Sequence, residues 1–440
     1  MNQQKTSPRP AATPLPQGEG TVRHAFPHSS NALSTGTPSS ALSGTPTPTL
    51  PSPRGRGAGG EVKPSRSRLF ALLGIAVLLL LLAGCGLPGT IPTGGHLQQR
   101  ASAPTPATGL PPIQFPQDEA PHHDLTEWWY YTGHAHGLDA QGQTHDYGFE
   151  LTFFQTLRGA FSPYYAAHFA ISDITAGAFH FDQRAGFEPA SVIPPAGSRN
   201  GFDVSLGGWS AQGLNGQDHL SATMANYVIS FQLAATKPPA LHGGNGLITY
   251  GPSGFSYYYS RTRMLLAGTL TDHGQRISVT GQAWMDHQWG NFVSLVGSGW
   301  DWYSIQLDND TEYMLYVIRD SQKRPVATFG TYVAGDGSAT ELAPTDIASR
   351  ALSTWTSPHT GGVYPSGWAV SIASQQLDLT LTPQLLDQEL VTTQSTGVAY
   401  WEGAVRISGT LRGQPITGLG YVELTGYATL PSSSQSAAVP

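Results

Sequence analysis

The sequence predicts an all-β protein, and three observations support this prediction. The 440 residues include 52 glycines and 34 prolines but only 12% charged residues, a composition typical of many strands and turns. Apolar residues alternate with polar or small ones in stretches such as 147–153 and 227–233, which is the period of a half-buried strand. Turn signals separate these stretches at 139–142, 272–274 and 412–415. No amphipathic helix is evident in the sequence, apart from a possible helical turn at 344–351.

The first 62 residues are rich in Pro, Ser, Thr and Gly. Such a segment cannot bury a core, so we expect it to be disordered. Signal peptides normally begin close to the start of a chain, and the apolar segment begins only after these residues. We therefore expect translation to start near Val62 and residues 1–61 to be absent from the product. If Met1 is the start, the apolar segment is instead a signal anchor.

Residues 63–85 have the pattern of a bacterial lipoprotein signal peptide. Basic residues precede an uncharged apolar run over 69–84, which is shorter than a membrane span of about 20 residues. The run ends in Leu-Ala-Gly-Cys, which resembles a lipobox. Cys85 is therefore predicted to carry a lipid that anchors an extracytoplasmic protein to the cell envelope. The alternative is a buried free cysteine; a disulfide within the chain is excluded because Cys85 is the only cysteine.

Beyond this leader we expect a Pro/Thr-rich tether over 86–112, β-barrel domains over 113–292 and 293–432, and a disordered tail over 433–440. A weak internal repeat supports the two domains. A Gly-Thr-Leu triplet, a Gly-Gln turn and an aromatic-x-acid strand occur in 267–286 and again in 408–423. Each half would then open and close with similar strands, as a barrel does when its ends meet.

The charge distribution argues against nucleic acid as a partner. The formal net charge is −7, and 27 of the 29 acidic residues but only 14 of the 22 basic residues lie after position 84. Contacts to phosphates need a basic face, which this acidic body is not expected to offer.

Three short clusters combine tryptophan with tyrosine, acidic residues or histidine, at 122–134, 284–290 and 300–303. Successive side chains of a strand point to opposite faces, so His287 and Trp289 would share one face and Asp286 would lie on the other. Large aromatic side chains beside a few polar groups indicate a site for an apolar ligand. The alternative is that Trp284 and Trp289 belong to the core, while Asp286 and His287 satisfy buried backbone groups.

The clusters are part of a wider resemblance. Residues 126–133 (TEWWYYTG), 284–290 (WMDHQWG) and 418–427 (GLGYVELTGY), with 258–263 and 300–303, resemble the AttH-like family. That family includes the lipocalin-like carotenoid 1,2-hydratases (hydroxyneurosporene synthases) and proteins classed as secreted hydrolases. The resemblance covers about residues 112–430, nearly the whole chain after the leader, and implies two lipocalin-like β-barrels in tandem.

In the hydratases, a His-x-Trp pair and a later Tyr-x-Asp pair are implicated in adding water to a terminal isoprenoid double bond. His287 and Trp289 match the first pair. Tyr313 and Tyr316 lie where the second is expected, but neither is followed two residues later by aspartate. The chemistry implied for an alkene needs no cofactor: an acid with a raised pKa protonates the double bond, aromatic faces stabilise the cation, and histidine orients water.

We therefore predict catalytic roles for Asp286, His287, Trp289 and Asp301, with Asp301 as the substitute acid of the second half. The predicted ligand-binding residues are Glu127, Trp128, Trp129, Tyr130, Trp300, Trp302 and Tyr316. For Glu127 a structural ion pair with Arg263 is the favoured alternative, because buried carboxylates are usually paired.

Histidines are frequent in the first half, namely His122, His123, His134, His136, His145 and His168. His134 and His136 would share a strand face, as metal ligands often do. No HExxH or cysteine-based motif accompanies them in the sequence, so we predict no metal and no cofactor. The sequence also lacks a Gly-x-Ser-x-Gly elbow and a phosphate-binding glycine loop.

The sequence thus predicts an extracytoplasmic protein, bound to a membrane through Cys85, that binds an apolar isoprenoid or lipid-like molecule and acts on it as a hydratase or hydrolase. The alternative function is a non-catalytic lipid carrier of the cell envelope. The position of Asp286 and His287, in a cavity or in a packed core, discriminates between the two.

Overall fold

A computed structural model describes residues 109–157, 163–187, 199–250, 254–292 and 299–430, and these residues form two antiparallel sheets. The predicted leader, Cys85, most of the tether and the tail lie outside the described residues. Apart from short 3-10 turns such as Gln117–Glu119 and His242–Gly244, the described residues contain strands and loops, so the all-β prediction is confirmed. In these residues we find no helix long and apolar enough to cross a membrane.

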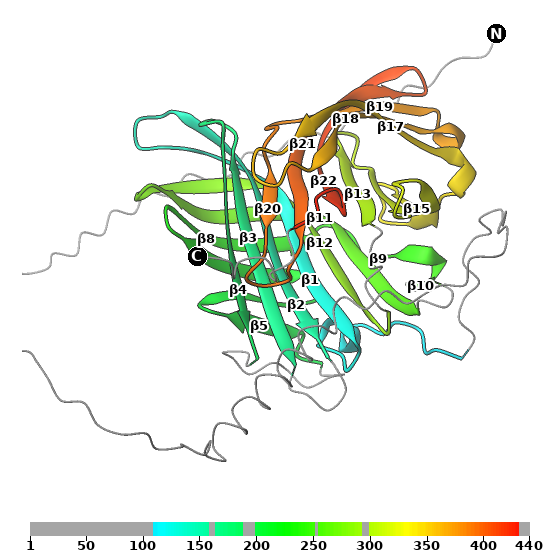
Figure 1. Ribbon diagram of the computed structural model, residues 1–440, viewed down its shortest axis with the longest axis horizontal. Helices are drawn as coiled ribbons and strands as arrows, with labels where there is room; N and C mark the ends of the chain where they lie inside the picture. Colours follow the sequence, from blue (N-terminus) through cyan, green and yellow to red (C-terminus); the bar gives the residue numbers. More distant parts are fainter. Residues whose placement is uncertain (1–108, 158–162, 188–198, 251–253, 293–298, 431–440) are drawn as a thin grey trace, which may run out of the picture. The chain divides into compact units, whose positions relative to one another are not determined.

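The first sheet contains twelve strands and curls into a nearly closed barrel (Figure 1). Its strand order is β4-β3-β2-β1-β12-β11-β8-β7-β6-β5, with β9 and β10 paired to β11. The first strand pairs with the last, whereas no ladder joins β4 to β5 in the described residues. The strands are β1 (Thr126–Leu138), β2 (Thr144–Thr156), β3 (Tyr164–Asp173), β4 (Ala178–Gly186), β5 (Phe202–Leu206), β6 (Trp209–Leu214), β7 (Gln217–Met224), β8 (Tyr227–Ala235), β9 (Ala240–Leu241), β10 (Leu247–Thr249), β11 (Phe255–Asp272) and β12 (Gln275–Gly290).

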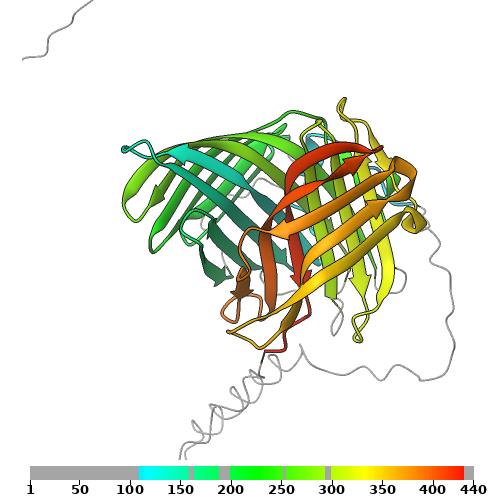
Figure 2. The same ribbon diagram turned by 90° about the horizontal axis from the view of Figure 1, so that it is seen from above.

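The second sheet contains ten strands and forms a half-barrel (Figure 2). Its order is β16-β15-β14-β13-β22-β21-β19-β18-β17, with β20 paired to β21, so the first and last strands of this half also pair. The strands are β13 (Gly299–Leu307), β14 (Glu312–Arg319), β15 (Pro325–Val333), β16 (Ala339–Glu341), β17 (Ile347–Thr356), β18 (Val363–Ile372), β19 (Leu377–Pro383), β20 (Glu389–Val391), β21 (Ala399–Leu411) and β22 (Gln414–Thr425). The helical turn expected at 344–351 is only a 3-10 turn over Pro344–Asp346, because β17 begins directly after it.

The internal repeat corresponds to two equivalent hairpins. His273 and Gly274 connect β11 to β12, and Arg412 and Gly413 connect β21 to β22, with positive φ at all four positions. A two-residue loop with two positive φ angles is the turn that matches the twist of antiparallel strands. The Gly-Gln turns of the sequence therefore fix the register of the last strand pair in each half.

Period-2 alternation places one side of each strand inside the barrel. Tyr147, Phe149, Leu151 and Phe153 are buried and belong to the core of the first barrel, as the alternation predicts. The second sheet has its own core, which includes Tyr303, Trp368 and Trp401. Each sheet therefore buries an apolar face of its own, which is the requirement for an independent layer of structure.

A third apolar cluster joins the outer face of the first barrel to the second sheet. Tyr130 and Trp284 each make edge-to-face contacts with Trp302 of β13, at centroid distances of 5.3 and 5.9 Å. His134 of β1 contacts the carbonyl oxygen of Gly420 in β22 at 3.0 Å. The strands β1 and β12 therefore have two buried faces, one toward the barrel interior and one toward the second sheet.

Candidate functional site

Strand alternation and register bring four of the predicted residues to the inner face of the first barrel. Glu127 of β1 lies opposite Trp289 of β12, and Trp129 lies opposite His287. All four side chains are buried, and Glu127 and His287 are 0% exposed. This is the strand face that the spacing of His287 and Trp289 predicts.

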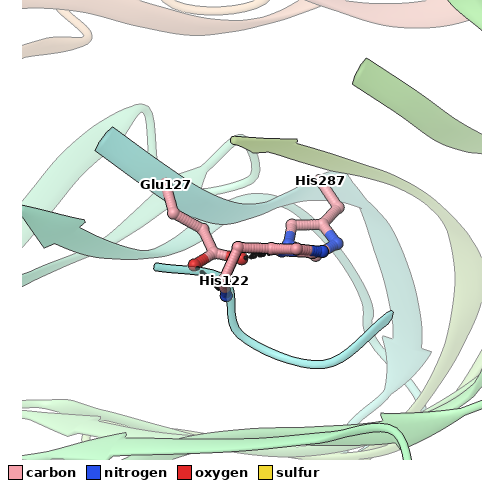
Figure 3. A group of neighbouring side chains, drawn as sticks. All are labelled: His122, Glu127 and His287. Atoms are coloured by element: carbon pink, nitrogen blue, oxygen red, sulfur yellow. Dashed lines mark hydrogen bonds and ion pairs between the residues drawn. The ribbon is translucent and has the colours of Figure 1, made fainter. Parts of the chain in front are cut away.

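A single carboxylate oxygen joins two histidines at the centre of this group (Figure 3). Nδ1 of His122 and Nε2 of His287 each lie 2.8 Å from Oε1 of Glu127. The other oxygen, Oε2, accepts hydrogen bonds from the backbone N–H of His122 at 2.8 Å and from Nε2 of Gln155 at 3.2 Å. Glu127 is therefore held by four donors and its position is fixed.

Aromatic rings enclose the histidines. The imidazole of His122 stacks on Trp289 with a centroid distance of 4.0 Å and an interplanar angle of 3°. Trp129 stacks on His287 with a centroid distance of 4.8 Å. Tyr257 stacks on Trp289 with a centroid distance of 5.2 Å. Nε1 of Trp129 is buried and has no hydrogen-bond partner among the described residues.

The segment before β1 closes this end of the barrel and supplies His122. Glu119 of this segment forms a buried ion pair with Arg261 of β11, and the hydroxyl of Tyr257 donates to the carbonyl of Pro111 at 2.7 Å. Phe115 packs edge-to-face on Tyr259. The segment therefore lies over the buried Glu127, and the side chain of His122, 14% exposed, is the most accessible of the three polar groups.

The three groups differ in charge. Burial opposes charge on His122, but hydrogen bonds to Asp118 and Glu127 outweigh it and raise its pKa to about 9. Burial opposes charge on Glu127 as well, yet the bonds to both histidines keep its pKa below the usual value. Burial lowers the pKa of His287 against the effect of Glu127. At neutral pH the group thus holds one imidazolium, one carboxylate and one neutral imidazole.

The neutral tautomer of His287 follows from its partners. Its Nε2 carries a proton because Glu127 can only accept, so Nδ1 is the unprotonated nitrogen. Nδ1 lies 3.3 Å from the hydroxyl of Tyr259, which can donate to it. Tyr259 therefore holds the ring from the side opposite Glu127.

The same residues are the only described group of three side chains with convergent metal-ligand atoms. Two nitrogens and a carboxylate oxygen are a common zinc ligand set. The nitrogen–oxygen separations of 2.8 Å are hydrogen-bond distances. They are shorter than the roughly 3.3 Å between ligands of a tetrahedral ion with bonds of about 2.0 Å. The geometry therefore fits shared protons rather than a coordinated ion.

The expected ion pair between Glu127 and Arg263 is wrong. Nε of Arg263 instead lies 2.6 Å from Oε1 of Glu312 in β14, which also binds Lys237. A bulge between Arg261 and Met264 breaks the alternation of β11 and turns the Arg263 side chain toward the second sheet. Glu127 faces the barrel interior and is paired with histidines.

Asp286 lies on the outer face of β12, away from His287. It accepts hydrogen bonds from the hydroxyl of Tyr258 at 2.5 Å, from Nε1 of Trp284 at 2.6 Å and from Ser260. Burial raises the pKa of Asp286 to about 7, although these donors oppose the shift. Nε1 of Trp302 donates to the same Tyr258 hydroxyl at 2.9 Å, which connects Asp286 to the second sheet.

Most of the other predicted ligand-binding residues lie in this cluster between the sheets. Its buried or half-buried aromatic members include Trp128, Tyr130, Trp300, Trp302 and Tyr316. Asp301 lies elsewhere: Arg319 binds it at 2.9 Å and the hydroxyl of Tyr427 donates to it at 3.0 Å. The predicted site residues therefore separate into three places rather than one.

The structure adds interior residues that sequence patterns did not single out. Asp218 of β7 is buried in the first barrel, where the hydroxyl of Tyr131 donates to Oδ2 at 2.8 Å. Its Oδ1 has no hydrogen-bond partner among the described residues. Burial raises the pKa of Asp218 to about 7. The sequence held one sign of this interior acid: Asp218 lies on the same face of β7 as Leu220, and that face is otherwise apolar.

Comparison with known proteins agrees with this architecture. The profile of the AttH-like family matches residues 106–427. Kievitone hydratase from Fusarium solani subsp. phaseoli is 26% identical over 233 residues, which is 51% of this chain; the match spans only 65% of the length of that relative. The crystal structure of an AttH-type protein from Nitrosomonas europaea is 31% identical, with a TM-score of 0.65, and the match covers 74% of this chain and 100% of that chain.

A crystal structure of kievitone hydratase from Nectria haematococca matches 74% of this chain and 97% of its own, at 20% identity and a TM-score of 0.58, and this likeness concerns the fold alone. The family match covers nearly all of the described residues, including both sheets and the His122–Glu127–His287 group. The chain belongs to the AttH-like family.

Proposed function

We propose that this protein is a cofactor-independent hydratase that adds water to a carbon–carbon double bond of an apolar, isoprenoid- or lipid-like molecule inside the first barrel. The observation that carries this proposal is Glu127, whose one oxygen contacts both His122 and His287 at 2.8 Å within an aromatic enclosure. The similarity to kievitone hydratase supports a hydration reaction. Hydrolysis of an apolar ester is the second candidate reaction, because it also requires an activated water.

The residues of the barrel interior divide the reaction between an acid and a base. Asp218, a carboxylic acid with a pKa of about 7, donates a proton to one alkene carbon. The faces of Trp129 and Trp289 stabilise the resulting cation. Water adds to the other carbon and passes its proton to Nδ1 of His287, which gives up its hydrogen bond from Tyr259. His287 then releases this proton to solvent and Asp218 takes one up from solvent, which restores both groups. His122, as an imidazolium, keeps Glu127 ionised and oriented.

Two buried polar atoms without partners support a ligand in this barrel. Buried polar atoms are usually hydrogen-bonded, and exceptions often mark a missing water or ligand. Nε1 of Trp129 is a donor without an acceptor, and Oδ1 of Asp218 also lacks a hydrogen-bond partner among the described residues. Both atoms lie inside the first barrel. Because the segment 109–125 covers Glu127 and His287, entry of a substrate requires this segment to move.

We further propose that the protein works outside the cytoplasm, anchored by a lipid on Cys85. The support is the sequence alone: the Leu-Ala-Gly-Cys box follows a basic and then apolar leader. A lipid anchor places the barrel beside a membrane, where apolar substrates partition.

The proposed hydration is tested with the full chain and a panel of isoprenoid alcohols and prenylated phenols in water labelled with oxygen-18. The expected product is heavier by one labelled water, and Glu127→Gln should lose it while His136→Ala, at an exposed histidine of the same strand, should not. Turnover that persists undiminished in Glu127→Gln would refute the site. If the parent and Glu127→Gln both bind compounds of the panel tightly without converting them, the protein is a carrier instead.

A further inference from the structure

Two glutamates face each other across the contact between the sheets. Glu150 belongs to β2 of the first sheet and Glu402 to β21 of the second, and each is 1% exposed. Glu423 of β22 lies opposite Glu402 in the strand register. Three carboxyl groups, two of them buried and that of Glu423 half-buried, therefore meet in one region that the proposed reaction does not use.

The two glutamates exchange hydrogen bonds between the sheets. The hydroxyl of Tyr400, from the second sheet, donates to Oε1 of Glu150 at 2.9 Å. In return, Tyr130 of the first sheet donates to Oε1 of Glu402 at 2.7 Å. Each sheet thus offers one acid and one phenol to the other, and these bonds form only when the sheets are in contact.

No cation balances these acids. Among the described residues, none of Glu150, Glu402 and Glu423 forms an ion pair with lysine, arginine or histidine. Oε2 of Glu150 and Oε2 of Glu402 have no hydrogen-bond partner, and neither does the nearby hydroxyl of Thr132. An unpaired buried carboxylate is costly, whereas a neutral carboxylic acid can use its O–H to satisfy such an atom.

One positive charge acts near the contact: Arg406 of β21 is exposed and opposes protonation of His134, but among the described residues it forms no ion pair with the acids. The groups that face the acids are Tyr130 and His134 of β1, His168 of β3, Asp286 of β12, Tyr400 of β21 and Tyr421 of β22. Burial lowers the pKa of His168 to about 3 and of His134 to about 4, so both are neutral. Asp286 is a further acid.

We propose that the contact between the two sheets is a proton-dependent junction, closed by neutral Glu150, Glu402 and Glu423 and loosened when these acids ionise. Burial raises the pKa of Glu150 to about 7 and of Glu423 to about 8, and burial together with the neighbouring carboxylates raises the pKa of Glu402 well above its usual value. The folded pKa values exceed the unfolded value near 4.5, so the stability of the junction is complete below about pH 4.5 and is lost progressively as the pH rises from there through 7 to 8.

Hydrogen–deuterium exchange of the full chain between pH 5.5 and 9, corrected for the intrinsic pH dependence of exchange, tests this junction. We expect protection of β1, β2, β21 and β22 to fall by roughly tenfold or more per pH unit between pH 5.5 and about 7 to 8, the interval that lies between the unfolded and the folded pKa values of Glu150 and Glu423. Strands β7 and β8, which lie away from the junction, should keep their protection. Glu402→Gln and Glu150→Gln, which cannot ionise, should each flatten the pH dependence, whereas Glu341→Gln, an exposed glutamate on β16, should match the parent.

Three results would overturn the junction. One is constant protection of β1 and β21 up to pH 9 in the parent. Another is an unchanged pH dependence in both glutamine variants, or in Glu423→Gln if the other two fail to fold. The third is restoration of protection at pH 9 by calcium, with the ion retained in native mass spectrometry, because the acids would then hold a cation instead of protons.

Discussion

His122 stacks face to face on Trp289, with ring centroids 4.0 Å apart and planes within 3° of parallel. His122 belongs to the segment before β1, and Trp289 lies at the end of β12. The stack therefore holds this segment against the barrel. A protonated imidazole over an indole is a cation–π contact, which strengthens when it is shielded from water. The stack therefore couples the charge of His122 to the closure of the barrel.

Replacement of Glu127 should affect both activity and stability. Glu127→Gln keeps the shape but loses the charge that holds the two histidines, and general acid–base groups contribute about 10²- to 10⁴-fold to rates. We expect a comparable loss of hydration, and a loss of about 1–3 kcal/mol in the free energy of unfolding because buried donors lose their acceptor. Steady-state kinetics and urea unfolding measure the two effects. Full activity at unchanged stability would exclude Glu127 from both roles.

Asp218 and Asp286 allow a matched comparison of two buried acids with similar pKa values, about 7 in each case. Asp218 faces the barrel interior, where Tyr131 donates to it, and Asp286 faces the second sheet. Asp218→Asn should abolish hydration while Asp286→Asn retains it, provided both variants fold by circular dichroism. The parent rate should fall as the pH rises above 7, since the donor is then ionised. The reverse pattern between the two variants would place the reaction between the sheets.

The pKa of His122 gives the stability a defined pH dependence. Its folded value near 9 exceeds the unfolded value of about 6.5, so its contribution is complete below pH 6.5 and is lost as the pH rises through 9. The difference in unfolding free energy between the parent and His122→Gln should shrink over this interval. Denaturant unfolding at pH 6, 7.5 and 9 measures it. A difference that is independent of pH would mean that His122 is neutral in the folded protein.

Trp289 belongs to the core and to the site at once, since it is 3% exposed and stacks on both His122 and Tyr257. Trp289→Ala should therefore cost about 3–5 kcal/mol in unfolding free energy, whereas Trp289→Phe should retain most of the stability. If Trp289→Phe folds but binds an isoprenoid probe at least tenfold more weakly, the indole serves the ligand. Equal binding by parent and phenylalanine variant would limit Trp289 to packing.

The lipid anchor is tested by Cys85→Ser. This variant should leave the membrane fraction and should not incorporate a labelled fatty acid, since no other cysteine can replace Cys85. Peptide mapping of the native product should at the same time find no peptides from 1–61. Retention of Cys85→Ser in the membrane fraction, with no label in the parent, would contradict the lipoprotein interpretation.

Local patterns predicted much of the fold. The glycine turns at 273–274 and 412–413 fixed two hairpins, and strand alternation correctly separated Asp286 from His287 and Trp289. Both are local properties, set by φ preferences and by the period of a strand. The AttH-like motifs added the tandem arrangement of the sheets.

The rest depended on contacts that no local pattern encodes. The bulge between Arg261 and Met264 turned Arg263 away from the barrel interior, which removed its predicted pairing with Glu127. His122 lies in a segment without period, so its place beside Glu127 follows only from the folded chain. Asp301 sits in the same sequence cluster as Trp302 but faces the opposite side of β13, where Arg319 neutralises it.

The protonation of the two histidines is the most direct test of this site, because the proposed chemistry depends on one charged and one neutral ring sharing Glu127. Nitrogen-15 NMR of histidine-labelled protein at pH 7, with His122→Gln and His287→Gln as assignment variants, measures it. We predict that both ring nitrogens of His122 carry protons and that His287 is neutral with its proton on Nε2. A neutral His122 at pH 7, or a His287 protonated on Nδ1 alone, would contradict the account.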